Sequence, residues 1–229
     1  MHSAVAYHDR IASDWDPRYR KASFAVREAI LAACLTDLPL ASTRWLDAGC
    51  GSGTLARWLA RRGCRVDGVD ASAHMIRAAD ELARHESYGN RLSFRVGALE
   101  QLDGEAGGYD GVLCSSVLEY LDRPADCLAR FARLLKPRGA LVVSVPHKYS
   151  LVRRALAVVH RLAPNRLAYF RHSKNEYSLR EFSLLLQENH FEVERAYYFG
   201  GGLPGRLQRL PCFASLIMFL AFRTIELSR

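Results

Sequence analysis

The chain has 229 residues, against roughly 150 for a typical domain, which predicts one domain with additions. Hydrophobic residues make up 49% of it and charged residues 24%, a globular composition that excludes a disordered chain or a small disulfide scaffold. The net charge of +8 makes nucleic acid, anionic lipid and an acidic small molecule candidate partners, and charge alone does not choose among them.

The six cysteines form no Cys-x-x-Cys pair and have no histidines at metal spacing, so neither a disulfide framework nor a metal site is expected. Residues 1–20 hold no apolar signal segment, and free thiols suit a reducing compartment, so we expect a cytoplasmic protein. The longest apolar run, 213–222, has about half the length of a membrane-spanning helix. Peripheral contact with a membrane stays open.

The predicted elements begin with one or two helices over residues 5–34. From 42 to 145, short apolar runs alternate with segments of helical periodicity, the pattern of a doubly wound parallel sheet with crossover helices. The predicted strands are 44–48, 65–70, 92–96, 111–115 and 140–145; the predicted helices are 54–62, 73–85 and 123–135, the last ended by a breaker at 136–139.

The remaining elements follow this core. Residues 149–165 predict a basic amphipathic helix, and 178–189 a second helix with Ser178 as its N-cap. Residues 191–199 predict a strand. The run 214–223 is apolar on every side, so buried strand and buried helix both fit, and we favour the strand.

The segment that carries chemistry is 45–55, an apolar strand that ends at Asp47 and is followed by glycines at alternate positions and a helix. Glycines there permit a tight turn and let a ligand approach the backbone N–H groups of a helix N-terminus. A second strand ends at Asp70, placed to accept hydrogen bonds from ribose hydroxyls. The glycine turn and Asp70 together predict a nucleoside ligand, although Gly51-x-Gly53-x-x-Ala56 also fits a relaxed dinucleotide-binding pattern.

The segments 46–53 (Leu-Asp-Ala-Gly-Cys-Gly-Ser-Gly) and 69–76 resemble the first two motifs of class I S-adenosylmethionine-dependent methyltransferases, of the small-molecule, type 11-like kind. The resemblance continues through 109–120 and 134–141, and more loosely at 177–182 and 189–193. It implies a single domain with a Rossmann-like, seven-stranded, mostly parallel sheet and helices on both faces. Its parts would be an N-terminal helical lid (1–41), a cofactor core (42–146), a helical substrate cover after strand five (147–176) and a C-terminal helix with strands (177–229).

The resemblance also implies S-adenosyl-L-methionine as cofactor and S-adenosyl-L-homocysteine as its product. Asp47 would orient the methionine end, and Asp70 would bind the ribose. Ala98 stands where the family often has an acidic residue, so Glu100 or a backbone group would replace that contact. The expected cofactor-binding residues are Asp47, Gly49, Cys50, Gly51, Gly53, Asp70, Ala71, Met75, Ala98, Leu99, Cys114 and Ser115.

His147 and Glu119 follow the fifth and fourth predicted strands, where an acceptor would meet the methyl group, so they are the candidate catalytic residues; a loop histidine and a helix-start acid are their alternatives. The expected substrate or lid residues are Tyr7, Trp15, Tyr19, Tyr120, His172 and Tyr177. The basic stretch 153–174 is interleaved with apolar residues, so a solvated face and an interfacial role both fit.

The favoured function is methyl transfer to a small or lipophilic acceptor, an acidic one among the candidates. One alternative is an RNA methyltransferase, which the charge favours and the lack of an appended RNA-binding module opposes. Another is a membrane-associated adaptor that binds the cofactor without turnover. A dehydrogenase is excluded because no second nucleotide-binding half fits in the length.

Overall fold

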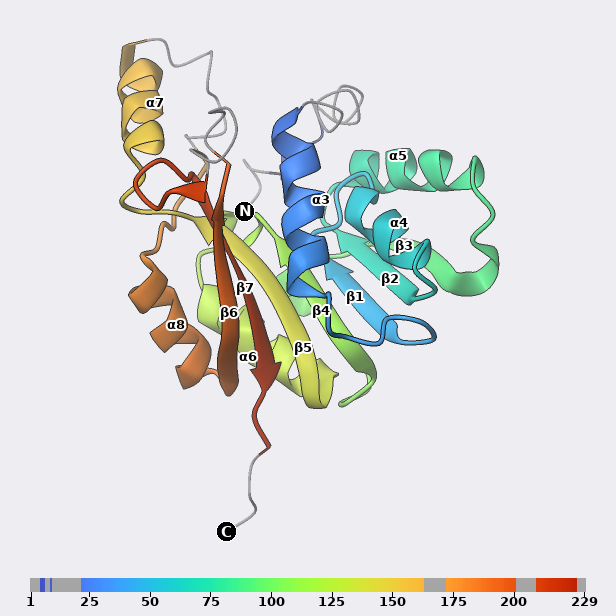
Figure 1. The fold of residues 1–229 in the computed structure, drawn as a ribbon. Helices are drawn as coiled ribbons and strands as arrows, with labels where there is room; N and C mark the ends of the chain where they lie inside the picture. The colour runs from blue at the N-terminus through green and yellow to red at the C-terminus, as the bar shows by residue number, and fades with distance from the viewer. Residues whose placement is uncertain (1–4, 7–8, 10–21, 163–171, 201–208, 226–229) are drawn as a thin grey trace.

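The computed structural model describes residues 5–6, 9, 22–162, 172–200 and 209–225. Seven strands form one sheet in the order β3-β2-β1-β4-β5-β7-β6 (Figure 1). The five parallel strands are β1 (Arg44–Ala48), β2 (Arg65–Asp70), β3 (Leu92–Val96), β4 (Tyr109–Ser115) and β5 (Leu135–Pro146). The predicted seven-stranded, mostly parallel sheet is confirmed.

The other two strands are antiparallel. β6 (Phe191–Phe199) pairs only with β7 (Leu216–Arg223) within this sheet, and β7 pairs on its other side with β5. The strand order reverses between β1 and β4, and in open α/β sheets ligands bind at the carboxyl ends of the strands at such a reversal. The prediction of a strand for the apolar tail is confirmed, since burial between two neighbours explains a run that is apolar on every side.

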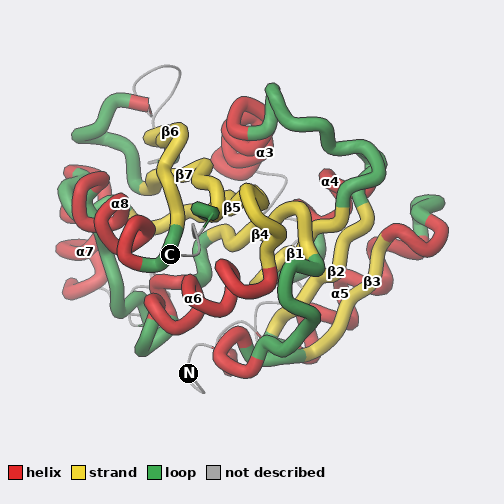
Figure 2. The backbone as a smooth tube through the Cα atoms, turned by 90° about the horizontal axis from the view of Figure 1, so that it is seen from below, coloured by secondary structure: helices red, strands yellow, loops and turns green. Residues whose placement is uncertain are grey.

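Helices cover both faces of the sheet. α3 (Ala22–Cys34) lies on one side, and α6 (Pro124–Leu134) and α8 (Leu179–Glu188) lie on the other (Figure 2). α4 (Thr54–Ala60) and α5 (Ala73–Arg84) pack on β2 and β3. Two apolar cores result, one on each face, and together they cover β1, β4 and β5.

α7 (Leu151–Leu162) stands apart from these layers, beyond the carboxyl end of β5 (Figure 1). Its position agrees with the predicted helical segment after strand five. Among the helices in the described ranges, none has the length and apolarity that crossing a bilayer requires.

The region 136–139 differs from its prediction as a break between a helix and a strand. The structure places these residues inside β5, where Tyr109 pairs with Leu135 and Gly111 pairs with Ala140. The residues between these pairs form a bulge, and Arg138 takes a left-handed φ of 59° within it. The Pro and Gly therefore mark an irregularity in a strand, because the strand resumes its pairing beyond them.

Candidate functional site

A turn of three glycines joins β1 to α4 at the carboxyl edge of the sheet. The backbone N–H groups of Gly49 and Cys50 donate to the carbonyl of Val69, at 2.7 and 3.1 Å, and so attach the turn to β2. Gly49, Gly51 and Gly53 have φ values of 80°, 53° and 73°, the left-handed region that favours glycine. A Cβ on Gly49 would lie 2.3 Å from Cγ2 of Val117, so the loop after β4 packs directly against this turn.

Asp70, at the end of β2, holds two loops together. Its Oδ2 accepts from the Gly51 N–H at 2.9 Å, and its Oδ1 accepts from the Ser72 N–H at 2.8 Å. The Ser72 hydroxyl then caps α5 by accepting from the N–H of Met75. Each carboxylate oxygen has more than one lone pair, so this geometry leaves acceptor capacity for ribose hydroxyls.

Asp47 lies at the base of the glycine turn and is only 2% exposed. Its Oδ2 has no hydrogen-bond partner among the described residues. Burial, and then the charge of Asp70, raise the pKa of Asp47 to about 7, against a backbone hydrogen bond with Ala56 that lowers it. A buried carboxylate oxygen without a donor beside a glycine turn fits the ammonium group of an amino-acid ligand, and together with Asp70 it fits S-adenosylmethionine.

The other expected cofactor contacts lie around this turn or in the core below it. Ala71 follows β2 directly, and Ala98 precedes a short 3-10 helix, η3 (Leu99–Gln101). Cys50 and Cys114 are buried, and burial raises the pKa of both thiols far above the ordinary value, which disfavours a nucleophilic role. Met75 and Leu99 are buried as well.

A second group of polar side chains lies beside this turn, at the carboxyl ends of β4 and β5. Nη1 of Arg27, on α3, donates to the hydroxyls of Ser115 and Ser116 at 2.5 and 2.9 Å. The Ser144 hydroxyl lies 3.1 Å from that of Ser115 and accepts from the Ser116 N–H at 3.0 Å. Ser116 has a φ of 58°, which is uncommon for a residue with a side chain.

Glu119 follows in a 3-10 helix, η4 (Leu118–Tyr120), and is only 4% exposed. Its Oε2 has no partner among the described residues. The backbone N–H groups of Lys174 and Asn175 donate to its carbonyl at 2.7 and 3.2 Å. Burial raises the pKa of Glu119 to about 7, although Arg27 and Arg153 lower it.

His147, the other candidate base, is buried where β5 ends. Its Nδ1 lies 3.3 Å from the carbonyl of Ala214, and its ring packs against Tyr198 at 5.1 Å between centroids. Burial lowers the pKa of His147, against hydrogen bonds to the backbone carbonyls of Ala214 and Pro211, which raise it. The imidazole is thus held by the segment that precedes β7.

The expected substrate and lid residues are placed only in part. Tyr177 forms an isolated parallel β-bridge with His147 through the backbone. Burial, and then the charge of Glu119, raise the pKa of Tyr177. Tyr120 and His172 are half-buried. Tyr7, Trp15 and Tyr19 lie outside the described residues.

Two buried arginines were not predicted as site residues. Arg27 shares the helical spacing of the buried residues Ile30, Leu31 and Cys34, so an arginine within an apolar stripe was the available signal. Arg153 belongs to the stretch interpreted as a solvated or interfacial face, but it points inward and its Nη2 donates to Glu176 at 2.5 Å. Asp67, on β2, accepts hydrogen bonds from Arg44, Ser93 and Tyr109.

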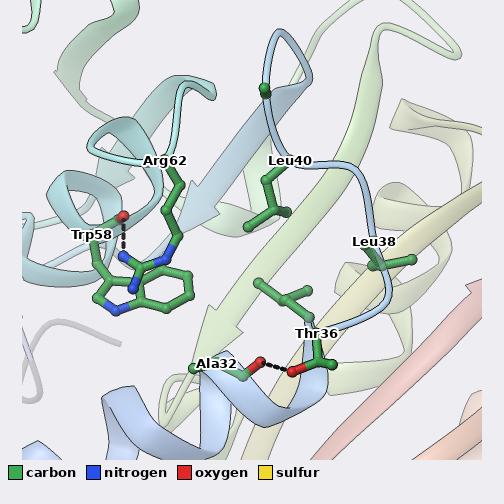
Figure 3. Close-up of a pocket in the computed structure, with 8 residues that line it drawn as sticks. Ala32, Thr36, Leu38, Leu40, Trp58 and Arg62 are labelled. Carbon is green, nitrogen blue, oxygen red and sulfur yellow. Dashed lines mark hydrogen bonds between the residues drawn. The ribbon is translucent and has the colours of Figure 1, made fainter.

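A cavity in the described part lies away from this site. It has a volume of about 410 Å³ and lies between the end of α3, the loop before β1, and α4 (Figure 3). The guanidinium of Arg62 stacks on Trp58 at 3.4 Å from the ring centroid. This cavity lies by the amino end of β1, opposite the edge that holds Asp47. No group of three potential metal ligands occurs within the described ranges.

Residues 18–196 match the family model of a methyltransferase domain. The chain is 36% identical over 147 residues to a ubiquinone biosynthesis O-methyltransferase of Xylella fastidiosa, covering 63% of this chain and 58% of that protein. It is also 36% identical over 155 residues to the protein of that name from Caulobacter, covering 61% of each. The chain thus spans little more than half the length of the curated relatives it matches.

Two solved structures share the fold across nearly the whole chain. The magnesium protoporphyrin IX methyltransferase of Synechocystis, solved with S-adenosylhomocysteine, has a TM-score of 0.73 at 24% identity and covers 96% of this chain and 99% of its own. The 1,6-didemethyltoxoflavin-N1-methyltransferase of Burkholderia thailandensis has a TM-score of 0.67 at 24% identity, covering 98% and 89%. The two solved structures share this chain's fold, and because the family model matches more than half of the chain, the chain belongs to the family of methyltransferase domains.

Proposed function

We propose that the protein transfers a methyl group from S-adenosylmethionine to a small-molecule acceptor. The observation that carries this proposal is the buried Oδ2 of Asp47 beside the glycine turn, which has no hydrogen-bond partner in the described part of the chain. When bound, S-adenosylmethionine supplies a methyl group on a sulfonium, which is reactive without further activation. Positioning and the exclusion of water can then supply much of the rate acceleration.

In this proposal each part of the site has a binding role. Asp47 accepts hydrogen bonds from the ammonium group, Asp70 accepts them from the ribose hydroxyls, and the turn from Gly49 to Gly53 lets backbone lie against the ligand. Ala71, Met75, Ala98 and Leu99 line the adenine side. Cys50, Cys114 and Ser115 border the methionine portion.

Calorimetry with S-adenosylhomocysteine tests the cofactor part. We expect wild type to bind and both Asp70→Ala and Gly51→Val to lose binding at least about tenfold. Asp70→Ala removes a charged hydrogen-bond partner, and Gly51→Val puts a branched side chain at a φ of 53°, which favours glycine. Asp103→Ala is the matched control because the Asp103 side chain is 91% exposed. Equal binding by both site variants and wild type would contradict the proposal.

The acceptor class is proposed from the site and the relatives together. The curated relatives are named as O-methyltransferases, which supports a hydroxyl acceptor. The buried Arg27 and Arg153 support an acceptor that carries negative charge elsewhere in its structure. The lid (1–41) and the cover (147–176) would enclose it, and Arg27 and Arg153 come from these two segments.

We also propose that α7 contacts an anionic membrane surface, from which a lipophilic acceptor would enter. Leu151, Val158 and Leu162 are 50%, 54% and 83% exposed, and they recur at helical spacing beside the exposed Arg154 and Arg161. An apolar stripe flanked by arginines suits a headgroup region with negative charge.

Vesicle flotation tests this contact. Wild type should float with vesicles that contain phosphatidylglycerol and stay at the bottom with pure phosphatidylcholine. The double variant Val158→Glu with Leu162→Glu should lose flotation. Leu184→Glu, on α8, is the control because Leu184 is also exposed. Flotation that survives the α7 changes would overturn the proposal.

A further inference from the structure

The site contains a second buried carboxylate that cofactor binding does not use. Glu119 is 4% exposed and its Oε2 has no hydrogen-bond partner among the described residues, as is the case for Asp47 Oδ2. Leaving a buried carboxylate oxygen without a donor costs free energy. A ligand that supplies the missing donor would offset this cost.

The two carboxylates flank one place at the carboxyl edge of the sheet. Both Glu119 and Asp47 raise the pKa of the Cys114 thiol in addition to its burial, so both lie near the end of β4. Val117, two residues before Glu119, packs on Gly49 of the cofactor turn. A ligand donor that reaches Glu119 is therefore next to the bound cofactor.

The groups that face Glu119 come from several elements. The positive charges of Arg27, on α3, and Arg153, on α7, lower the pKa of Glu119 and so favour its ionised form. After burial, the charge of Glu119 also raises the pKa of Tyr177, in the segment before α8, and of Cys114, on β4. The burial that opposes ionisation and the two guanidiniums that favour it leave both protonation states accessible near neutral pH.

His147 is a weaker candidate on the same criteria. Its Nδ1 faces the carbonyl of Ala214, and Tyr149 and Tyr198 pack against its ring. A buried carboxylate oxygen that lacks a donor has capacity to accept a proton, whereas this imidazole is held by the chain around it.

We infer that Glu119 is the general base that receives the proton of a hydroxyl acceptor, an inference that rests on the proposed methyl transfer. Glu119 Oε2 gains the hydroxyl proton while the acceptor oxygen bonds to the methyl carbon. The electron pair of the broken methyl–sulfur bond stays on sulfur, and the proton later leaves to solvent. The inference applies to hydroxyl acceptors, which must lose a proton. Carboxylate acceptors are already ionised and need no base.

The test compares wild type, Glu119→Gln and the control Glu192→Gln, whose residue is exposed on β6. Transfer of labelled methyl is measured to catechol, a hydroxyl probe, and to benzoate, a carboxylate probe. For catechol, kcat/KM of wild type should rise with pH to about 7 and then level off, because the base acts when it is ionised. For Glu119→Gln, kcat/KM for catechol should be lower by roughly a hundredfold, and its pH profile should no longer rise to a plateau at about pH 7.

Calorimetry separates this inference from the proposed function. Glu119→Gln should bind S-adenosylhomocysteine as wild type does, and failure of wild type itself to bind would contradict the proposed function instead. A Glu119→Gln rate within about threefold of wild type with an unchanged pH profile would overturn the inference, since a general base contributes more than that.

A measurement that needs no acceptor decides the case in which neither probe is methylated. The infrared difference between wild type and Glu119→Gln, each with S-adenosylhomocysteine, isolates the carboxyl band of Glu119. If the band of the protonated Glu119 carboxyl disappears as the pH rises through about 7, the inference is supported. A carboxyl that stays ionised, or stays protonated, from about pH 5 to 9 overturns it.

Discussion

At the scale of the residue, Gly49 shows how conformation and packing act together at the site. Its φ of 80° disfavours any side chain, and its hydrogen atoms face Val117 where a Cβ would come within 2.3 Å of a methyl group. The two costs have different origins, since one belongs to the backbone and the other to a neighbour. They can therefore be separated by substitution.

Gly49→Ala should lower the free energy of unfolding by about 2–4 kcal/mol, the sum of left-handed backbone strain and overpacking. Adding Val117→Ala should return part of this loss, because only the clash is relieved. Urea denaturation of the two single variants and the double variant gives the coupling energy. Strictly additive effects would show that the clash does not contribute.

At the scale of the element, strands and caps were predicted better than irregularities. The strand at Phe191–Phe199 and the helix capped by Ser178 were predicted because their patterns are local. The bulge within β5 was not, since pairing with β4 decides whether a Pro-Gly segment separates a helix from a strand or lies inside the strand. Likewise Asp47 was predicted from the glycine motif and Asp70 from the end of the second strand, but the inward direction of Arg153 depends on Glu176, which lies beyond α7.

The capping box of α8 makes a prediction at this scale. The Ser178 hydroxyl accepts from the Glu181 N–H at 3.2 Å, and the Glu181 carboxylate accepts from the Ser178 N–H at 2.8 Å. Ser178→Ala should lower the free energy of unfolding by about 1 kcal/mol in urea denaturation. Ser178→Asp should restore most of it, because aspartate is an equally good cap. An unchanged midpoint in Ser178→Ala would contradict this.

At the scale of the whole molecule, the two buried carboxyls make stability depend on pH. The pKa of Asp47 and that of Glu119 are each raised to about 7 by burial, well above the ordinary values. Between about pH 4 and 7 the folded protein keeps protons that the unfolded chain has released. The free energy of unfolding from these groups is thus greatest below about pH 4, falls as pH rises, and levels off above 7.

Glu119→Gln should remove one of these contributions. Relative to wild type, the ligand-free variant should become progressively more stable from about pH 5 to 8, because glutamine carries no ionisation penalty. Urea denaturation at each pH gives the difference, and Glu192→Gln should run parallel to wild type. A difference between Glu119→Gln and wild type that does not change with pH would contradict the raised pKa.

The position of β7 between β5 and β6 also has a consequence for how the protein is made. β6 is synthesised before β7, yet within the sheet it pairs only with β7. A nascent chain that has emerged only to residue 215 therefore holds β6 without a partner and leaves one side of β5 open. Unpaired strand edges can pair with other chains. The nascent chain is therefore prone to aggregate until residues 216–223 pair with β5 and β6.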